Sequence, residues 1–254
     1  MGGTSPEVGK LTPAVSAGKI IFSAVDEFGD SLAVLTSFQR EGVIIIDLVS
    51  KIAPGIPIVT LDTGRLPAAT YEAIAMIEAR YGIRVERVVP DPCEVDAMVS
   101  AHGADLFQDS VPQRMLCCNV RKVRPLARRM ASTSAYFTGI RREQNEERGN
   151  VSVFDRTGRP VKISPLADWT GGEVAKYTNE HHLPVHPLYA EGYRSIGCDP
   201  CTRAVLAGED ERAGRWWWED DASKECGLHF SPDGRAERTV DVLLRHLLER
   251  AVTV

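Results

Sequence analysis

Two pairs of cysteines constrain the fold of this chain more than any other feature. Cys117-Cys118 and the segment Cys198-Asp199-Pro200-Cys201 hold four of the six cysteines, far apart in the sequence. A Cys-x-x-Cys turn places two sulfurs on the same side of a tight loop, where both can reach one metal centre. If both pairs serve the same centre, the fold must bring two distant segments together.

Several kinds of site fit these pairs. All-thiolate ligation suits an iron–sulfur cluster or zinc. Zinc ribbons usually carry two Cys-x-x-Cys knuckles, so the adjacent pair weakly favours a wider cluster over a single ion. A redox dithiol and buried cysteines packed as small hydrophobic side chains are the other readings. The spacing favours iron–sulfur and leaves the alternatives open.

Composition places the chain among ordinary globular proteins. Its 254 residues are 43% hydrophobic and 26% charged, which allows one large domain or two small ones. No apolar run approaches the ~20 residues that span a bilayer. Residues 1–10 lack the basic region and apolar core of a secretory signal. We therefore expect a cytoplasmic protein with reduced thiols and no membrane association.

The charge distribution is uneven. A formal net charge of −5 disfavours non-specific binding to nucleic acid. Basic residues nevertheless gather after both cysteine pairs and in a group between them: Arg121, Lys122, Arg124, Arg128, Arg129, Arg141, Arg142, Arg203, Arg212 and Arg215. In an acidic protein this clustering predicts a small anionic ligand, although any single arginine more often lies on a solvated helix face.

Helical and strand-like patterns alternate along the first part of the chain. We expect helices over 14–28, 42–51 and 66–81, and strands over 31–38, 55–61 and 84–89. This order predicts an α/β fold with a doubly wound, mostly parallel sheet. Ligands bind such sheets at the carboxyl ends of the strands, where the turns at Ser37 and Leu61–Gly64 are expected.

The rest of the chain continues this domain. We expect a mostly helical segment over 113–131, broken or kinked at Pro125, then strands over 136–140, 151–154 and 161–163. Thr170 and Glu173 form a capping box for a helix that runs to about His181. The predicted organisation is a disordered N-terminus (1–13), one α/β domain (14–215) and a C-terminal tail (216–254) that ends in an amphipathic helix over 240–248.

The tail holds a cysteine with the context of a nucleophile. Cys226 lies in a polar, glycine-containing segment, where Lys224 and His229 can favour its thiolate. An incidental surface cysteine fits the local sequence equally well. The tryptophans at 216–218 cannot all face one side of a helix, so we expect some to pack at an interface or against a lid. Cys93 has no assignable partner and is expected to be structural.

Six motifs follow one another in the order of a known family. They are Thr36-Ser37-Phe38-Gln39, Leu61-Asp62-Thr63-Gly64-Arg65-Leu66, Cys117-Cys118-Asn119-Val120-Arg121-Lys122-Val123, Thr138-Gly139-Ile140-Arg141-Arg142, Gly192-Tyr193 with Ile196-Gly197-Cys198-Asp199-Pro200-Cys201-Thr202-Arg203, and Glu225-Cys226-Gly227-Leu228-His229. From about Ser31 to His229 the chain resembles the assimilatory adenylyl-sulfate (APS) reductases, within the group that includes the phosphoadenylyl-sulfate (PAPS) reductases. The resemblance implies a single domain of the adenine nucleotide alpha hydrolase-like fold with a mobile C-terminal tail.

The resemblance also implies a cofactor and a reaction. One 4Fe-4S cluster per chain would be held by Cys117, Cys118, Cys198 and Cys201, and the presence of all four cysteines favours APS over PAPS as substrate. The implied reaction is the thioredoxin-dependent reduction of APS to sulfite and AMP in sulfate assimilation and cysteine biosynthesis. It would pass through an S-sulfonate on Cys226.

Residue roles follow from the same resemblance. Cys226 would be the nucleophile, His229 would contact the sulfate or assist the thiolate, and Lys122 would lie between cluster and substrate. The implied substrate-binding residues are Ser37, the backbone of Leu61 and Gly64, Arg141, Arg142, Arg148, Arg212 and Arg215. Arg148 requires a gap in the alignment.

The chain departs from the family at two places. Arg40-Glu41-Gly42 stands where many relatives carry an acidic pair, and the chain continues beyond His229 with a helix that could serve as a subunit contact in a homo-oligomer or as a local cover. The alternatives are a PAPS reductase that releases adenosine 3′,5′-bisphosphate, or a non-enzymatic iron–sulfur or zinc protein that binds nucleotides and senses redox state. In a sensor of this kind Cys226 would be dispensable.

Overall fold

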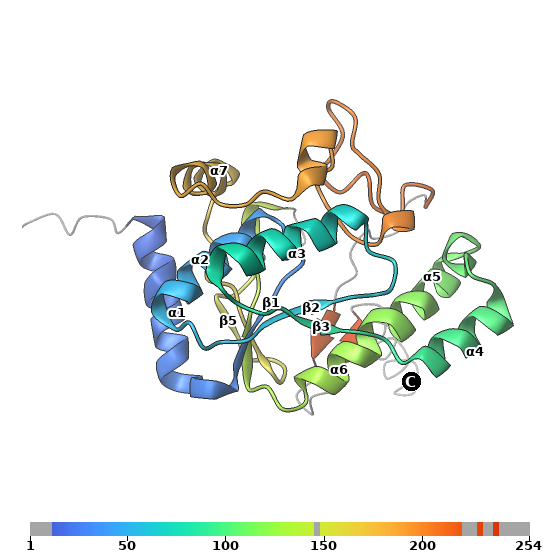
Figure 1. Ribbon diagram of the computed structural model, residues 1–254, viewed down its shortest axis with the longest axis horizontal. Helices are drawn as coiled ribbons and strands as arrows, with labels where there is room; N and C mark the ends of the chain where they lie inside the picture. Colours follow the sequence, from blue (N-terminus) through green and yellow to red (C-terminus); the bar gives the residue numbers. More distant parts are fainter. Residues whose placement is uncertain (1–11, 145–147, 220–227, 231–235, 239–254) are drawn as a thin grey trace, which may run out of the picture.

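A six-stranded sheet forms the centre of the computed structural model, which describes residues 12–144, 148–219, 228–230 and 236–238 (Figure 1). Its strands are β1 (Leu32–Leu35), β2 (Ile58–Leu61), β3 (Glu86–Val88), β4 (Ala135–Phe137), β5 (Phe154–Asp155) and β6 (Val161–Ile163), in the order β3-β2-β1-β4-β6-β5. All neighbours are parallel except β5, which runs antiparallel to β6 at the edge. The predicted mostly parallel α/β sheet is confirmed.

The helices alternate with these strands. They are α1 (Pro13–Phe28), α2 (Arg40–Ile52), α3 (Ala68–Tyr81), α4 (Pro92–His102), α5 (Val111–Cys118), α6 (Arg124–Met130) and α7 (Gly171–Glu180). Short 3₁₀ segments cover Gly29–Ser31, Leu106–Gln108, Arg142–Gln144, Pro187–Glu191 and Asp199–Cys201. Two further strands, β7 (Leu228–Phe230) and β8 (Ala236–Arg238), form an antiparallel pair, and β8 contacts α6.

Alternating side chains divide the sheet into two packed faces. Leu32 and Val34 of β1 belong to the main core, which also takes in residues of α1, α2, α3 and α7. The next residue, Leu35, packs on the opposite face with Leu61 and with α6. Because successive strand residues point to opposite faces, this parity places helices on both sides of the sheet. The sheet is therefore doubly wound, as predicted.

Two helical predictions need correction. No element was predicted between 89 and 113, so α4 was missed. Pro92 lies in the first turn, where its missing N–H costs nothing, and the Asp91 carboxylate caps the helix by accepting from the Cys93 N–H at 2.8 Å. Cys93 itself is exposed. The structural role expected of Cys93 is therefore wrong, because its side chain is not part of a packed core.

The segment that carries the first cysteine pair departs from α-helical geometry before Pro125, not at it. Proline has no N–H with which to continue an α-helical ladder, and the chain widens into a π-helical turn at Asn119–Val123 immediately before it. The segment then resumes as α6. Turns of this kind often accompany functional residues, and this one contains Lys122.

The last long described segment covers one side of the molecule. Residues 185–219 run above α3 in Figure 1, and His186 binds this segment to α3 through Thr70, with 3.0 Å between Nε2 and Oγ1. Trp216 is fully buried beside the cysteines, so it packs in the protein's own core. Cys226 and the helix predicted over 240–248 lie outside the described residues. No helix in the described part of the chain is long and apolar enough to cross a bilayer.

Candidate active site

A pocket of about 1580 Å³ opens at the carboxyl ends of the parallel strands. The chain winds outward from β1 through β2 to β3 and then crosses to β4 on the other side of β1. This reversal is the topological switch point at which doubly wound sheets bind ligands. Thr36 and Ser37 after β1, and Thr138 and Gly139 after β4, line the pocket. The position predicted for the ligand from the sequence agrees with this geometry.

The turn after β1 presents the start of α2 to the pocket. Phe38 is fully buried with a φ of 58°, and its N–H donates to Thr36 Oγ1 at 3.0 Å. Ser37 is therefore exposed on the pocket side, where its Oγ accepts from Gln39 Nε2 at 2.9 Å. The first N–H groups of a helix, together with its dipole, favour an anion at this position. Ser37, the residue predicted to bind phosphate, therefore lies in the pocket lining beside the start of α2.

Glycine is required where β4 approaches α2. A Cβ added to Gly139 would lie 2.7 Å from Glu41 Cβ and 3.1 Å from the Gly42 backbone nitrogen. Backbone atoms cannot move aside as a flexible side chain can. This contact fixes the end of β4 against the first turn of α2, and so sets the distance between two walls of the pocket.

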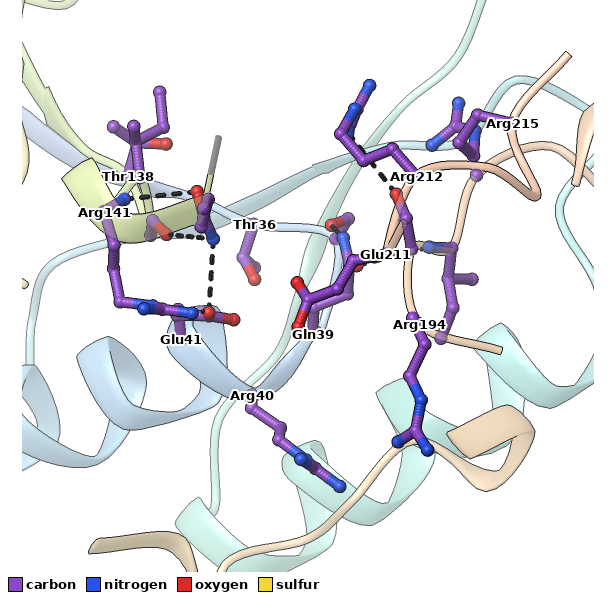
Figure 2. A pocket seen from close by; sticks show the side chains of 18 of the residues that line it. Thr36, Gln39, Arg40, Glu41, Thr138, Arg141, Arg194, Glu211, Arg212 and Arg215 are labelled. Atoms are coloured by element: carbon purple, nitrogen blue, oxygen red, sulfur yellow. Dashed lines mark hydrogen bonds and ion pairs between the residues drawn. The ribbon is translucent and has the colours of Figure 1, made fainter. Parts of the chain in front are cut away.

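Arg141 connects the same two elements. Its Nε donates to Glu41 Oε1 at 2.8 Å, and its Nη1 donates to Glu143 Oε2 and to the Trp169 carbonyl, both at 3.1 Å. The arginine is buried, and Figure 2 shows it directed along the pocket wall toward Glu41. The guanidinium is thus occupied by protein groups. Its predicted contact with substrate stays a prediction, whereas its role in joining β4 to α2 is visible.

Arg142 does not line the pocket. Its Nε donates to the Val151 carbonyl at 2.9 Å, and its guanidinium forms an ion pair with Asp168. The structure therefore does not bring Arg142 together with the other predicted substrate-binding residues. Arg148 does line the pocket and donates to Gln144.

A second group of basic residues, Lys122, Arg212 and Arg215, also lines the pocket. Figure 2 shows Arg212 and Arg215 across the pocket from Arg141, and Arg212 Nη1 donates to Ser195 Oγ at 3.4 Å. Arg215 is buried against Gly197, where any Cβ would collide with its guanidinium. This wall therefore concentrates positive charge beside the Cys198–Cys201 segment.

The predicted adenine-binding backbone lies on a third side. Leu61 lines the pocket at the end of β2. Gly64 is in the next turn with a φ of 70°, and its N–H donates to Asp62 Oδ1 at 3.1 Å. Gly64 is not itself among the lining residues, although the adjacent Thr63 is.

The four predicted metal-binding cysteines surround a small cavity next to the pocket. All four line it, and each is 6–7% exposed. The remaining lining residues are Arg65, Phe107, Arg114, Arg121 and Lys122. Cys118 and Cys198 line both the cavity and the large pocket, so the two spaces share a wall. The fold does bring the two distant cysteine pairs together.

Burial and neighbouring groups shift the pKa values of the thiols in different directions. Burial raises the pKa of Cys117, and burial together with the nearby Cys198 raises the pKa of Cys201 to about 11. Burial opposes ionisation of Cys198 as well, but Lys122, a hydrogen bond with Thr63 and Arg215 together lower its pKa. Thr63 Oγ1 lies 3.2 Å from Cys198 Sγ. Of Cys117, Cys198 and Cys201, Cys198 is therefore the thiol most readily deprotonated.

The cavity suits an anionic, multi-thiolate group. Among the described residues, neither Arg65 Nη1 nor Arg121 Nε has a hydrogen-bond partner, although both atoms are buried and both residues line the cavity. Buried donors of this kind are expected to have an acceptor. No set of three or more His, Cys, Asp or Glu side chains in the described part of the chain is arranged to hold a single metal ion. A group with several sulfur acceptors would satisfy both the thiols and these arginines.

Comparison with known proteins identifies the family. Residues 31–204 match the phosphoadenosine phosphosulfate reductase domain. The chain belongs to this family. It is 47% identical over 208 residues to adenosine 5′-phosphosulfate reductase from Allochromatium vinosum, covering 80% of this chain and 81% of the relative. It is 40% identical over 227 residues to the protein of that name from Burkholderia cepacia, covering 87% and 91%. The resemblance stated from the motifs is confirmed.

Solved structures agree with this family and fold. The PAPS reductase from Candida auris, in a phosphate complex, is 25% identical and superposes with a TM-score of 0.64 over 78% of this chain and 93% of that structure. The FMN adenylyltransferase from Candida glabrata, in complex with FMN and an ATP analogue, is 13% identical with a TM-score of 0.56 over 93% of this chain and 79% of that structure. The second likeness concerns the fold alone.

The remaining predicted residues of this reductase fall in its last segment. Cys226 lies outside the described residues. His229 lies in β7, where its backbone is paired with Glu237 of β8. Because β8 contacts α6, the chain just after Cys226 returns to the helix that continues from the first cysteine pair.

Three pocket residues of the reductase were missed by the sequence reading. Arg40 stacks over the Tyr189 ring at 4.5 Å, and Arg194 and Glu211 also line the pocket (Figure 2). Arg40 was noted only as a departure from relatives, and nothing in the local sequence sets Arg194 or Glu211 apart from solvated loop residues. Their position depends on how residues 185–219 fold back over the sheet.

Proposed function

We propose that this reductase converts adenosine 5′-phosphosulfate to sulfite and AMP in sulfate assimilation, with Cys226 as the nucleophile. The observation that carries the proposal is the shared wall between a cation-lined pocket at the switch point and a cavity enclosed by four cysteines. The names of the relatives from Allochromatium vinosum and Burkholderia cepacia support APS as the substrate. The metabolites are soluble, and we place the reaction in the cytoplasm.

We further propose one 4Fe-4S cluster held by Cys117, Cys118, Cys198 and Cys201. Support comes from the soft all-thiolate donor set and from the buried arginine donors that face the cavity. When bound, the cluster would cross-link two distant segments and set the local electrostatic field, without carrying electrons in the reaction. Zinc remains the competing metal for four thiolates.

Substrate binding would divide the nucleotide among three walls. The start of α2 with Ser37 would receive the α-phosphate, and the backbone at Leu61 and Gly64 would hold adenine. Lys122, Arg212 and Arg215 would neutralise the sulfate beside the cysteines. An anionic thiolate can approach an anionic sulfate only after that charge has been compensated.

The first chemical step would be nucleophilic attack at sulfur. The Cys226 thiolate forms a bond to the sulfate sulfur while the bond from that sulfur to the bridging oxygen breaks, and AMP leaves with the electron pair. The enzyme then carries an S-sulfonate on Cys226. His229, three residues further along, would support the thiolate or contact the sulfonate.

The second step would require an external dithiol of the thioredoxin class. One of its thiolates attacks Cys226 Sγ, the S–S bond of the sulfonate breaks, and sulfite leaves with the electron pair. The second thiol of the dithiol then displaces Cys226 and leaves the dithiol as a disulfide. Two electrons thus pass from the dithiol to sulfur, and Cys226 returns to its starting state.

A specific observation also favours activity on PAPS. Arg40 and Arg194 add positive charge to the pocket beyond the residues expected to bind the phosphosulfate, and Arg194 makes no ion pair with another described residue. Either arginine could accommodate a 3′-phosphate. We keep APS as the main proposal, because the curated relatives carry that name.

The test is a comparison of APS and PAPS in the presence of thioredoxin and its reductant, with sulfite and the released nucleotide measured together. Iron and acid-labile sulfide are measured on the same preparation. We expect sulfite and AMP in equal amounts from APS, with much slower release of adenosine 3′,5′-bisphosphate from PAPS. Preferential use of PAPS would contradict APS as the proposed substrate. Zinc without acid-labile sulfide would contradict the proposed 4Fe-4S cluster. Nucleotide binding without sulfite from either substrate would favour the redox-sensor alternative.

A further inference from the structure

A buried ion pair joins the helix of the first cysteine pair to the last long described segment. Arg114 of α5 is hydrogen-bonded to the Glu219 carboxylate, and both side chains are less than 8% exposed. Arg114 precedes Cys117 by three positions and Cys118 by four, so all three lie on the same side of α5. Glu219 is the last residue described before the stretch that leads to Cys226.

The same arginine packs on a tryptophan of that segment. The Arg114 guanidinium lies 4.2 Å from the centre of the Trp216 ring, and Arg215 lies 4.9 Å from it. Trp216 is fully buried, and its backbone N–H donates to the Cys201 carbonyl at 3.2 Å. Residues 216–219 are therefore fixed to both cysteine-bearing segments, to Cys201 by the backbone and to α5 by Arg114.

A tight turn makes these contacts one unit. The Glu219 N–H donates to the Trp216 carbonyl at 3.0 Å, so the carboxylate and the indole are held in a fixed relation. Trp218 in the same turn packs on Phe107, with 6.0 Å between ring centres. Arg114 thus contacts both ends of a compact turn, which we call the tail anchor (residues 216–219).

Chain length links the tail anchor to the proposed nucleophile. Cys226 follows Glu219 by seven residues, so covalent geometry alone limits the distance between their Cα atoms to at most roughly 24 Å. Arg114 also lines both the large pocket and the cysteine cavity. The point from which Cys226 is tethered is therefore set by a residue at the wall of the pocket itself.

We propose that the Arg114–Glu219 pair is a positioning device for Cys226. By fixing the tail anchor on α5, it sets the origin of the tether and keeps the nucleophile within productive reach of the sulfate. The proposal rests on the function proposed above. It assigns Arg114 and Glu219 a role in the rate of sulfur transfer and none in holding the nucleotide.

The test compares Glu219→Gln and the double variant Arg114→Met/Glu219→Leu with the parent enzyme. The double variant replaces the buried pair with apolar side chains, an exchange that usually keeps a fold stable. Glu86→Gln is the matched control, because it removes a carboxylate whose Oε2 lies 2.9 Å from Arg129 Nη2, remote from the pocket lining. Two quantities are measured on each: the rate of S-sulfonate formation on Cys226 in a single turnover, and the dissociation constant of AMP.

We expect both tail-anchor variants to form the sulfonate at least about tenfold more slowly, because small misplacements of a reacting group are costly in rate. Their AMP dissociation constants should stay within about twofold of the parent value, which corresponds to about 0.4 kcal/mol. Unchanged sulfonation in the double variant would overturn the proposal. Weaker AMP binding in parallel with the loss of rate would overturn it too, since Arg114 would then be a nucleotide ligand.

Amide hydrogen exchange gives a reading that does not depend on the reaction. If the pair fixes the tail anchor, the N–H groups of Trp216 and Glu219 should exchange faster in both variants than in the Glu86→Gln control. Unchanged exchange at these amides would show that the Arg114–Glu219 pair does not hold the tail anchor, even if the parent enzyme forms the sulfonate normally. If the parent shows no adduct at all, the proposed function fails, and the exchange result still decides whether the pair holds residues 216–219.

Discussion

The adjacent residues Arg141 and Arg142 have different roles. Arg141 lines the pocket and donates to Glu41 and the Trp169 carbonyl, whereas Arg142 donates to the Val151 carbonyl, pairs with Asp168 and does not line the pocket. The motif predicted both as substrate ligands, because a sequence does not say which of two neighbouring side chains turns inward. The four cysteines were easier to predict, since their spacing carries the chemistry of one shared site.

Replacing Arg141 should lower stability before it affects chemistry. Arg141→Met leaves Glu41 buried without its partner, and breaking a buried pair costs about 3 kcal/mol or more. Denaturant unfolding of the variant should show this loss of unfolding free energy. The double variant Arg141→Met/Glu41→Gln should recover a part of it, because the orphaned charge is gone. Equal losses in the single and double variants would contradict the assigned ion pair.

His186 gives the protein a stability that depends on pH. Burial lowers its pKa to about 4, while an unfolded histidine has a pKa near 6.5. Below about pH 6.5 the unfolded chain takes up a proton that the folded state refuses, so the free energy of unfolding falls between about pH 6.5 and 4. The full effect is about 3 kcal/mol for this pKa difference.

His186→Asn isolates this contribution. Asparagine can still accept from the Leu188 N–H, as His186 Nδ1 does at 3.3 Å, but it cannot titrate. Denaturant unfolding at about pH 7.5 and about pH 4.5 should show a smaller loss of stability in the variant than in the parent. An identical pH dependence in both proteins would contradict the assignment to His186.

At the scale of elements, the sequence located the strands and helices better than their ends. The strand predicted over 136–140 stops at Phe137, because the following residues leave the sheet to form the pocket wall and Gly139 packs on α2. The apolar pattern continues past the point where pairing stops. Helix α4 was not predicted, although the Asp91 cap and Pro92 in its first turn are both helix-start signals in the sequence.

Adding a methyl group at Gly139 tests how closely the chain after β4 approaches α2. Gly139→Ala places a Cβ 2.7 Å from Glu41 Cβ and should cost about 1–3 kcal/mol of unfolding free energy, as overpacking usually does. It should also weaken AMP binding, since the pocket walls must separate. Gly55→Ala is the control, because nothing lies within 4 Å of a Cβ there. Equal stability of the two variants would show that the approach is not tight.

In the described part of the molecule, the sheet and the cysteines pack in separate apolar regions. The first covers the two faces of the sheet, one with residues of α1, α2, α3 and α7 and the other with residues of α6. The second joins Cys117, Cys198 and Cys201 to Phe107 and Trp216. The sequence predicted the first from alternating patterns. For the second it predicted only that the two cysteine pairs meet, and not which side chains pack around them, because residues from α4, α5 and the 198–219 segment meet only after the chain has folded.

Removing the proposed cluster should therefore loosen one region selectively. A bound group that interacts only with the folded state adds its binding free energy to stability. After chelation, amide exchange should accelerate in α4, α5 and residues 198–219, while β1 and α2 keep their protection. Metal-loaded protein of the same preparation is the reference. Uniform acceleration throughout the chain would contradict the division into two regions.

The mass of the intact protein after incubation with APS, without any reductant, tests the central claim most directly. We predict one added SO₃ group, located on the peptide that contains Cys226 and released as sulfite when thioredoxin is added. The Cys226→Ser variant should bind AMP but gain no mass, while Cys93→Ser, which changes an exposed cysteine on α4, should react like the parent. An unmodified parent protein that still binds nucleotide, or an adduct on any other residue, would contradict the account.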